Sequence, residues 1–163
     1  MMTQRKIEKD LVIRNLRRED KVSIVEVDSL STGYRREIYF DRKFKRLFGE
    51  DAPFLMGMVA EFKGKVIGFI MGEVNVGEFG MERPVASIDT IGIHPQFRRK
   101  GIGKMLLDEY CSMAAKAGIE VMTTLVSEDW PEVVAFFTAQ GFKPVRMMAM
   151  EKKLPREGLF CRE

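Results

Sequence analysis

The sequence has little of what metal sites and disulfide frameworks need. Among its 163 residues there are two cysteines, Cys111 and Cys161, and one histidine, His94. The cysteines have no metal-ligand spacing, and a lone histidine cannot build a histidine-based cluster. We therefore expect no metal cofactor and no structural disulfide. His94 precedes Pro95, which indicates a surface turn residue rather than a catalytic base.

Long apolar runs are also absent. No uninterrupted apolar run approaches the roughly 18 residues of a membrane span, and residues 1–10 are charged, without the apolar stretch of a secretory signal. The 27 lysines and arginines nearly balance the 24 aspartates and glutamates, and a net charge of +3 is too mild to imply nucleic-acid binding. These absences predict a cytoplasmic protein with neither a membrane nor a nucleic acid as its partner.

The composition that is present, 45% hydrophobic and 31% charged residues, is that of an ordinary globular protein. The length fits one domain with one substantial core, and there is no internal repeat or low-complexity linker. We expect a flexible tail at residues 1–10, one domain at residues 11–154 and a C-terminal tail at residues 155–163.

Periodicity in the first half of the chain predicts a strand followed by two helices. The strand is LVIRNL at residues 11–16, and a turn at residues 17–20 leads into the first helix. A second helix is expected within residues 31–49. We expect it to end at Gly49, where a left-handed cap is common.

A β-hairpin is expected next. Its strands are residues 57–62 and 65–76, joined by the tight turn Lys63-Gly64-Lys65. Gly68 and Gly72 inside the second strand indicate bulges or close backbone approach.

The following strand, residues 85–93, carries polar residues in an apolar run. Alternation places Ser87, Asp89, Ile91 and Ile93 on one face and Ala86, Ile88, Thr90 and Gly92 on the other, unless a bulge breaks it.

The last third of the chain predicts a helix, a strand, a helix and a strand. The first helix begins at Ile102 and ends at Gly118, and residues 119–126 read as a buried parallel strand. Pro131 starts a helix that runs to Gly141, and a last strand is expected at roughly residues 142–154. The fold class is therefore α/β in a single mixed sandwich.

The stretch IHPQFRRKGIGKMLL, residues 93–107, joins a strand to a helix and gathers Arg98, Arg99, Lys100 and Lys104 around two glycines. It fits neither the P-loop nor the dinucleotide-binding template, because Met105 and Leu106 stand where those patterns need Ser or Thr and a glycine. A helix N-terminus favours an anion, whereas basic residues there oppose the helix dipole unless an anion is bound. The pattern favours a diphosphate site over a merely solvated helix start.

This segment resembles a known family. Arg98-Arg99-Lys100-Gly101-Ile102-Gly103 matches the Arg/Gln-x-x-Gly-x-Gly/Ala signature of the GNAT N-acetyltransferase superfamily, and FFTAQGF, residues 136–142, resembles its aromatic pair followed by Gly-Phe. The resemblance spans roughly residues 11–154. It implies one GNAT-type domain, with a mixed sheet of six to seven strands flanked by about four helices, and acetyl-CoA as co-substrate without a metal.

The resemblance also implies which residues hold the co-substrate. The pyrophosphate would lie on the amides and side chains of Arg98, Arg99, Lys100, Gly101, Ile102, Gly103 and Lys104. The strand residues Ile91, Gly92 and Ile93 would bind the pantetheine arm and present an amide to the thioester oxygen. Phe137 is expected to contact the pantetheine or the acetyl group.

Two positions depart from the family pattern. Phe137 stands where many members have a tyrosine that protonates the leaving sulfur, and Trp130 replaces a frequent asparagine. A thiolate leaves readily, so water can supply that proton. Loss of the tyrosine does not by itself make the protein inactive.

Asp89 is the preferred candidate for the base. An equally favoured alternative is that Asp89 is purely structural, with its carboxylate held by backbone donors. Glu73 is the second candidate base. Tyr34 is a candidate acid or a residue lining the acceptor site.

The expected activity is that of an acyltransferase of the EC 2.3.1 class, which transfers acetyl from acetyl-CoA directly to a primary amine. The alternative is an inactive GNAT-fold module that binds CoA and regulates. The acceptor is left open among a protein N-terminus, a lysine, a polyamine, an amino sugar and an antibiotic, and family members commonly form homodimers. The basic residues Arg35, Arg36, Arg42, Lys43, Lys45 and Arg46 read as a solvated helix face rather than a nucleic-acid site, and by resemblance they form an acceptor wall.

Overall fold

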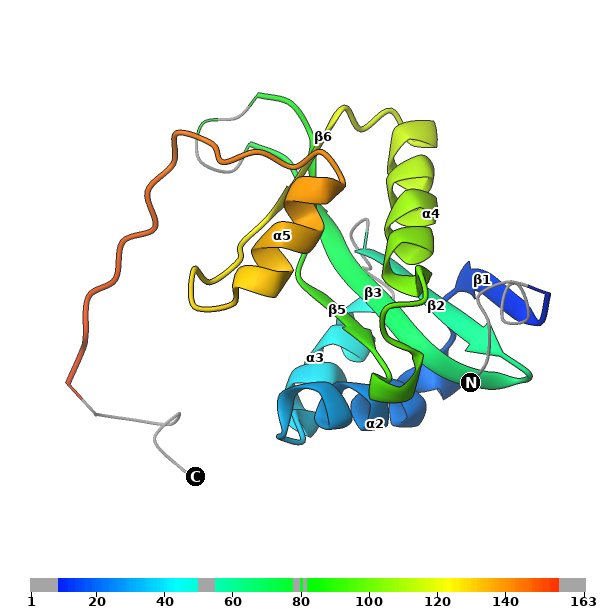
Figure 1. Cartoon of the computed structure of the whole chain (residues 1–163). Coiled ribbons are helices and arrows are strands. Elements are labelled where there is room, and N and C mark those ends of the chain that lie inside the picture. Colours follow the sequence, from blue (N-terminus) through cyan, green and yellow to red (C-terminus); the bar gives the residue numbers. More distant parts are fainter. Residues whose placement is uncertain (1–8, 50–54, 78–79, 81, 156–163) are drawn as a thin grey trace. The chain divides into compact units, whose positions relative to one another are not determined.

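The computed structural model describes residues 9–49, 55–77, 80 and 82–155, in two compact units that divide after Val126. Each unit is described by itself. The second contains α5 (Pro131–Ala139). The first contains β1 (Leu11–Asn15), the 3-10 turn η1 (Arg18–Asp20), α2 (Lys21–Thr32), α3 (Glu37–Leu47), β2 (Leu55–Phe62), β3 (Lys65–Asn75), β4 (Val85–Ile88), β5 (Thr90–Ile93), the 3-10 turn η3 (Pro95–Phe97), α4 (Ile102–Lys116) and β6 (Val121–Thr124) (Figure 1).

The sheet of the first unit is mixed. Its strand order is β1-β2-β3-β4-β6, and β5 also pairs with β3. All pairs are antiparallel except β4 with β6, which is parallel. The expected α/β class is confirmed, and the described residues form six strands and four α-helices, within the expected six to seven strands and about four helices. The hairpin turn forms at Lys63 and Gly64, whose φ angles of 50° and 76° suit the right-handed twist of the strands.

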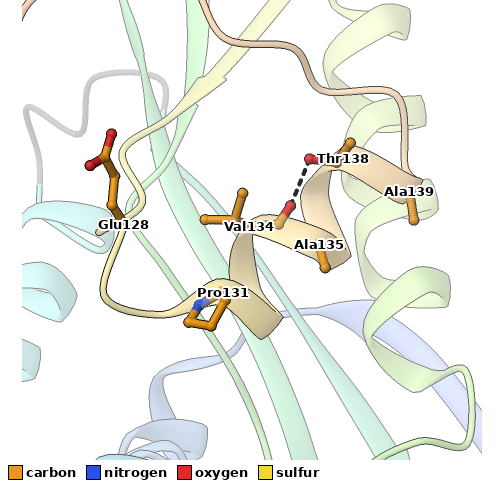
Figure 2. A pocket seen from close by; sticks show the side chains of 6 residues that line it. All are labelled: Glu128, Pro131, Val134, Ala135, Thr138 and Ala139. Carbon is orange, nitrogen blue, oxygen red and sulfur yellow. Dashed lines mark hydrogen bonds between the residues drawn. The ribbon is translucent and has the colours of Figure 1, made fainter.

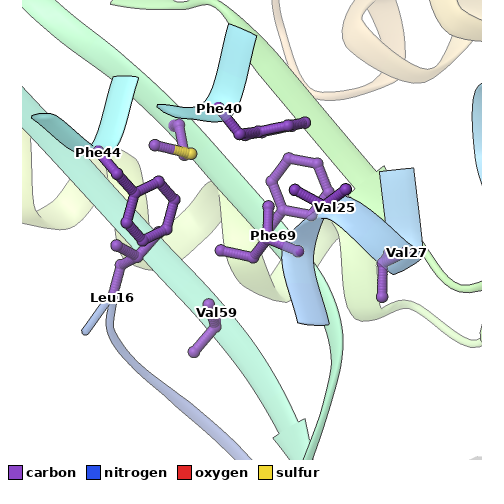
Figure 3. Close-up of a cluster of buried hydrophobic side chains, with 9 residues drawn as sticks. Leu16, Val25, Val27, Phe40, Phe44, Val59 and Phe69 are labelled. Carbon is purple, nitrogen blue, oxygen red and sulfur yellow. The ribbon is translucent and has the colours of Figure 1, made fainter. Parts of the chain in front are cut away.

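The two faces of the sheet are covered by different helices. Successive strand residues point to opposite faces, and Phe69 and Met71 of β3 pack with Phe40 and Phe44 of α3 in one buried cluster (Figure 3). Its other members are Leu16, Ile24, Val25, Val27 and Val59. Gly68, on the opposite face, lies against Leu106 of α4. Helices α2 and α3 therefore cover one face, and α4 covers the other.

Gly49 does not end α3 in the predicted left-handed conformation. Gly49 is not among the described residues that have a positive φ angle. The C-cap of the helix is Phe48, whose amide donates to the Phe44 carbonyl. A Cβ on Gly49 would lie 2.8 Å from the Lys45 carbonyl oxygen, so a close approach explains this glycine. At the end of α4, Gly118 does take a positive φ of 83°, as predicted.

The prediction of a last strand at residues 142–154 is wrong. The described residues 142–155 form no strand, and Val145, Met147, Met148, Met150 and Leu154 are exposed. A strand needs a neighbour for its backbone groups, and the apolar pattern alone does not supply one. The strand expected at residues 119–126 forms as β6 and is parallel, but it is the last in the strand order and its side chains are not buried.

Candidate active site

The strand predicted at residues 85–93 is interrupted at Asp89, and this break organises the site. The pairing of β3 with β4 ends at the pair Val74–Ala86, and the pairing of β3 with β5 begins at the pair Met71–Thr90. Between these pairs two residues of β3 face three residues of the other strand, which is a β-bulge. The predicted alternation fails here, because Asp89 and Thr90 are consecutive and yet both contact side chains of α3.

Gly72 allows this bulge to approach β3. A Cβ on Gly72 would lie 1.8 Å from the carbonyl oxygen of Ser87 and 2.4 Å from the hydroxyl of Tyr110. That hydroxyl donates to the same Ser87 carbonyl over 3.0 Å, so α4 holds the bulge from the opposite face. The close backbone approach predicted for Gly72 is confirmed.

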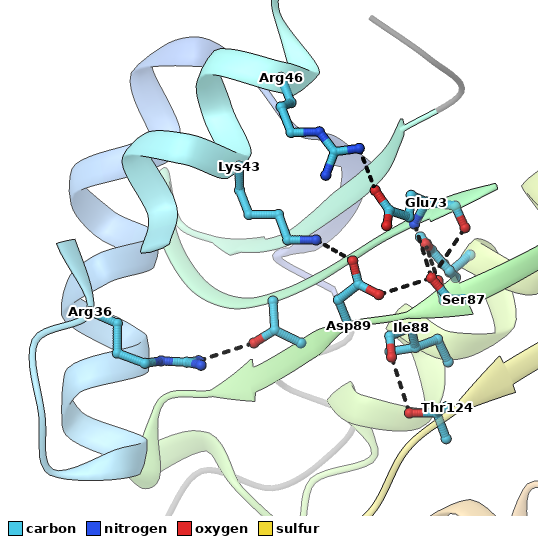
Figure 4. Close-up of polar contacts among 10 residues, drawn as sticks. Arg36, Lys43, Arg46, Glu73, Ser87, Ile88, Asp89 and Thr124 are labelled. Atoms are coloured by element: carbon cyan, nitrogen blue, oxygen red, sulfur yellow. Dashed lines mark hydrogen bonds and ion pairs between the residues drawn. The ribbon is translucent and has the colours of Figure 1, made fainter. Parts of the chain in front are cut away.

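The carboxylate of Asp89 is held by two side chains. The Lys43 ammonium donates to Oδ2, and the Ser87 hydroxyl lies 2.8 Å from Oδ1 (Figure 4). The Asp89 amide donates to the Met71 carbonyl over 2.9 Å, which fixes the backbone at the bulge. With its side chain 22% exposed, Asp89 is partly accessible to solvent. It is a rigidly placed carboxylate whose present partner is a cation.

Glu73 stands beside Asp89 on the same face of the sheet. Its Oε2 atom lies 3.1 Å from a guanidinium nitrogen of Arg46, at ion-pair distance but without hydrogen-bond alignment. The Ser87 hydroxyl is also within 3.4 Å of the Glu73 amide and 3.3 Å of its carbonyl. Ser87 therefore joins the two candidate bases in one polar network.

The basic side chains of this network come from one stripe of α3 and its N-cap. Arg36, Lys43 and Arg46 are spaced seven and three residues apart, which places them on the same helix face. Each pairs with a different carboxylate: Arg36 with Asp28, Lys43 with Asp89 and Arg46 with Glu73. Arg36 also donates to the Thr90 hydroxyl over 3.3 Å.

Tyr39 lies within the same stripe. The Arg36 guanidinium sits 4.7 Å from the centre of its ring, and the Lys43 ammonium 5.8 Å from it. Burial raises the pKa of the Tyr39 phenol to about 12, with the nearby negative charge of Asp89 adding to the effect. Tyr39 is consequently a neutral hydrogen-bond donor at physiological pH.

Tyr34 is not brought to this network. It lies in the connection between α2 and α3 with 72% of its surface exposed. Its amide donates to the Thr32 hydroxyl, and that hydroxyl donates to the Tyr34 carbonyl. The structure places it away from contact with Asp89 and Glu73, so a role for its phenol stays a prediction.

The N-terminus of α4 has the features of an anion site. Its N-cap, Gly101, has a φ of 79°, and no side chain caps the helix. The first-turn amides, which have no partners inside a helix, are therefore open. Arg99 has a φ of 58°, a conformation that costs a residue with a side chain about 1 kcal/mol. This turn delivers Arg98, Arg99 and Lys100 to the start of the helix, and the residues present fit a diphosphate.

Most of these basic side chains make local contacts in the structure. Arg98 donates to the Ile93 carbonyl over 3.4 Å, Lys100 to the Gln96 carbonyl over 3.1 Å, and Lys104 pairs with Asp108 at 2.5 Å. These are weak, partly exposed contacts that an anion can replace.

His94 is the N-cap of η3, where its ring nitrogen accepts a hydrogen bond from the Gln96 amide, in keeping with the predicted turn.

β5 supplies the backbone that leads from Asp89 to this anion site. It pairs with β3 on one side, and in the described part of the chain no strand pairs with its other edge. Alternate backbone groups of Ile91, Gly92 and Ile93 thus point away from the sheet. A Cβ on Gly92 would lie 2.6 Å from the Phe69 ring, so this glycine makes room for the core.

The second unit carries the positions that depart from the family pattern. Phe137 is buried, with ring centres 5.1 Å from both Phe136 and Phe142, whereas Trp130 is exposed at the N-cap of α5. Figure 2 shows a pocket along α5, lined by Glu128, Pro131, Val134, Ala135, Thr138 and Ala139. Its lining includes none of the residues predicted for the site, and contact of Phe137 with a co-substrate stays a prediction.

The described residues contain no group of three or more histidine, cysteine, aspartate or glutamate side chains placed to hold a metal ion. Within the same ranges no helix has the length and apolarity needed to cross a membrane.

Sequence reasoning missed Lys43 and Ser87 as partners of the candidate base, and it missed Tyr39 beside Lys43. Ser87 was placed on the face of Asp89 by alternation, and its polarity in an apolar strand was an unused signal. The spacing of Arg36, Tyr39, Lys43 and Arg46 at three, four and three residues predicts one helix stripe, but nothing local shows that the stripe meets Asp89.

Comparisons with known proteins concern the family and the fold of this chain. The model of the acetyltransferase (GNAT) family matches residues 14–142. An uncharacterized N-acetyltransferase of Methanocaldococcus jannaschii is 27% identical over 143 residues, which cover 83% of this chain and 62% of that protein. The chain therefore spans less than two thirds of that relative's length.

Solved structures show the same fold at low identity. The aminoglycoside N-acetyltransferase AAC(6′)-Iy in complex with CoA has a TM-score of 0.74 at 17% identity, covering 88% of this chain and 94% of that one. An aminoglycoside acetyltransferase from an uncultured soil metagenomic sample, in complex with sisomicin, has a TM-score of 0.72 at 17% identity, covering 91% and 99%. AAC(6′)-Ih from Acinetobacter baumannii has a TM-score of 0.73 at 15% identity, covering 88% and 99%. With its family model matched over most of its length, the chain belongs to the acetyltransferase (GNAT) family.

Proposed function

We propose that the protein is an acetyl-CoA-dependent N-acetyltransferase that transfers acetyl directly to a primary amine. One observation carries the proposal: a fixed carboxylate, Asp89, directly precedes a strand that has no strand on one edge, and that strand leads through η3 to the uncapped start of α4. The base, the backbone donors and the anion site would thus follow one another within residues 89–104.

Acetyl-CoA would supply the activated acyl group as a thioester. The open amides at Ile102, Gly103 and Lys104, with Arg98, Arg99 and Lys100, would hold its diphosphate. The free edge of β5 would bind its amide-containing arm by backbone hydrogen bonds, as an added strand does. The family membership and the CoA complex of AAC(6′)-Iy support this placement.

Asp89 would take a proton from the acceptor. A primary ammonium has a pKa of about 10.4 and no free lone pair, so it must lose a proton before it can attack. Ser87 and the bulge hold the carboxylate in place for that task. An outward backbone N–H of β5 would stabilise the developing oxyanion, because such donors are fixed before the reaction begins.

No dedicated acid is required for the leaving group. A thiol of this type has a pKa near 8.5 by analogy with cysteine, so its thiolate leaves and collects a proton from water. Phe137 at the family's tyrosine position is compatible with this chemistry.

The test measures binding and turnover separately. Calorimetry should detect acetyl-CoA binding, and thiol release should follow on addition of an amine acceptor. Asp89→Asn should lower the rate by about 100-fold or more, the range typical of a general base. Asp41→Asn, which removes an exposed carboxylate of α3 paired with Lys21, is the matched control.

Each outcome has a distinct meaning. Absence of acetyl-CoA binding at millimolar concentration would contradict the proposal outright. Tight binding without thiol release on any protein, peptide, polyamine or small amine would favour a CoA-binding regulatory module instead. Equal rates for Asp89→Asn and wild type would remove Asp89 as the base while leaving the activity in place.

A further inference from the structure

The candidate base is already bound to a primary ammonium. Lys43 donates its Nζ to Oδ2 of Asp89, with only 14% of the Lys43 side chain exposed. An acceptor amine that approaches Asp89 in its charged form competes with Lys43 for the single negative charge of this carboxylate. Two ammonium groups beside one carboxylate need a further negative partner.

The described charges around the bulge leave no spare carboxylate. Three cations from α3 and its N-cap face three carboxylates, and each carboxylate has a partner. Figure 4 shows the pairs of Lys43 with Asp89 and of Arg46 with Glu73. The Asp28 side chain is 3% exposed and bonds twice to Arg36, so that pair is structural. Glu73 is paired with Arg46. Adding one ammonium leaves the group with an uncompensated positive charge.

The chemistry of the acceptor follows from that imbalance. A simple monoamine would leave Lys43 without a partner, and a polycation would bring further positive charge beside Lys43 and Arg46. An amine that carries its own anionic group restores the balance. Lys43 has a flexible four-carbon stem that can turn to such a group, and the half-exposed Arg46 guanidinium can bind a carboxylate or phosphate through two hydrogen bonds.

We infer that the acceptor is a primary amine bearing a carboxylate or phosphate, with its amine at Asp89 and its anion between Lys43 and Arg46. The inference rests on the proposed function and narrows its acceptor. Lys43 and Arg46 become the residues that determine specificity. Polycationic acceptors such as the sisomicin bound by the soil metagenomic acetyltransferase are then poor substrates for this protein.

The experiment uses acceptor pairs that differ in the anion alone. β-Alanine is compared with β-alaninamide, and phosphoethanolamine with ethanolamine, and spermidine and sisomicin represent polycations. Wild-type kcat/KM should be at least about tenfold higher for the anionic member of at least one pair, and lowest for the polycations. The two pairs distinguish a carboxylate from a phosphate requirement.

Variants of α3 test whether Lys43 recognises the anionic group of the acceptor. Lys43→Met should reduce the preference within the pair to less than about threefold, mainly through KM for the anionic acceptor, and Lys43→Arg should retain it. Lys116→Met is the matched control, because Lys116 is exposed in the last turn of α4 and is not among the residues predicted for the site. Circular dichroism confirms that each variant is folded.

The results separate this inference from the proposed function. If wild type acetylates spermidine or sisomicin as well as the anionic amines, or if Lys43→Met keeps the full preference, the inference is overturned and the proposed activity stands. If acetyl-CoA does not bind, both fall. If acetyl-CoA binds without turnover, calorimetry on the CoA complex decides. The amines that carry a carboxylate or phosphate should bind more tightly than their partners without that group, and equal affinity overturns the inference.

Discussion

Gly72 and Ser87 lie so close that a Cβ on Gly72 would come within 1.8 Å of the Ser87 carbonyl oxygen. The first prediction follows from this contact. Gly72→Ala should lower the free energy of unfolding by at least about 2 kcal/mol, because backbone and not a flexible side chain occupies the space. Urea denaturation measures the change.

Gly57→Ala in β2 is the control for Gly72→Ala. Its Cβ would meet the Leu16 side chain at 3.2 Å, and that side chain can shift. We expect a change within about 1 kcal/mol. Similar losses in the two variants would show that the bulge tolerates a side chain and does not depend on Gly72.

The second prediction concerns the start of α4. Gly103→Asp places a carboxylate among the first-turn amides, where it competes with a diphosphate and repels it. We expect acetyl-CoA affinity to fall by at least about tenfold, which corresponds to about 1.4 kcal/mol. Calorimetry measures it, and Ala115→Asp, at an exposed position near the other end of the same helix, should bind as wild type does. Unchanged affinity in Gly103→Asp would contradict the location of the diphosphate.

The third prediction concerns the pair of Arg14 with Asp20. Burial alone would raise the pKa of the Asp20 carboxyl, but hydrogen bonds from the Arg14 side chain and the Arg17 amide outweigh it and lower that pKa. A lowered pKa stabilises the fold above the unfolded value of about 4, and this contribution is lost as pH falls through the folded value. Asp20→Asn should cost about 2 kcal/mol at pH 7.

The pH dependence checks the assignment to Asp20. The stability difference between wild type and Asp20→Asn should shrink as pH falls below about 4. Asp41→Asn, which removes an exposed pair with Lys21, should cost less than about 0.5 kcal/mol at any pH. A difference for Asp20→Asn that stays constant from pH 7 to pH 2.5 would mean that packing and not charge explains the loss.

The fourth prediction concerns the phenol of Tyr39. Its pKa of about 12, raised first by burial, lies above the unfolded value of about 10. The stabilisation is therefore complete below pH 10 and is lost as pH rises through 12. Tyr39→Phe has no phenol to ionise, so its free energy of unfolding should not fall for this reason. The variant should therefore gain stability relative to wild type between pH 9 and pH 12. Urea denaturation across that range would refute the assignment if the difference stayed flat.

The turn and helix start at residues 98–103 could be predicted from the sequence because their determinants are local. Arg98 to Gly103 are contiguous, and the change from strand to helix periodicity at Ile102 sets the direction of the backbone amides. The hairpin at Lys63 and Gly64 was predictable for the same reason. Each depends on turn geometry within a few residues.

The surroundings of Asp89 could not be predicted in the same way. Lys43 is 46 residues away in the chain, and only the packing of α3 against the sheet brings it to the carboxylate. The bulge depends on Gly72 and Tyr110, which come from two further elements. The strand expected at residues 142–154 failed for a related reason, since an apolar pattern says nothing about whether a neighbouring strand is available.

The unequal edges of β4 and β5 have a consequence for solvent exchange. β4 pairs with a strand on both sides, β3 and β6, whereas in the described part of the chain β3 is the only strand that pairs with β5. The outward amide protons of β5 should therefore exchange with deuterium much faster than those of β4, although the two strands are adjacent in sequence. A molecule bound along β5 would slow that exchange. The exchange rates of residues 90–93 would therefore show whether a ligand is bound along this strand.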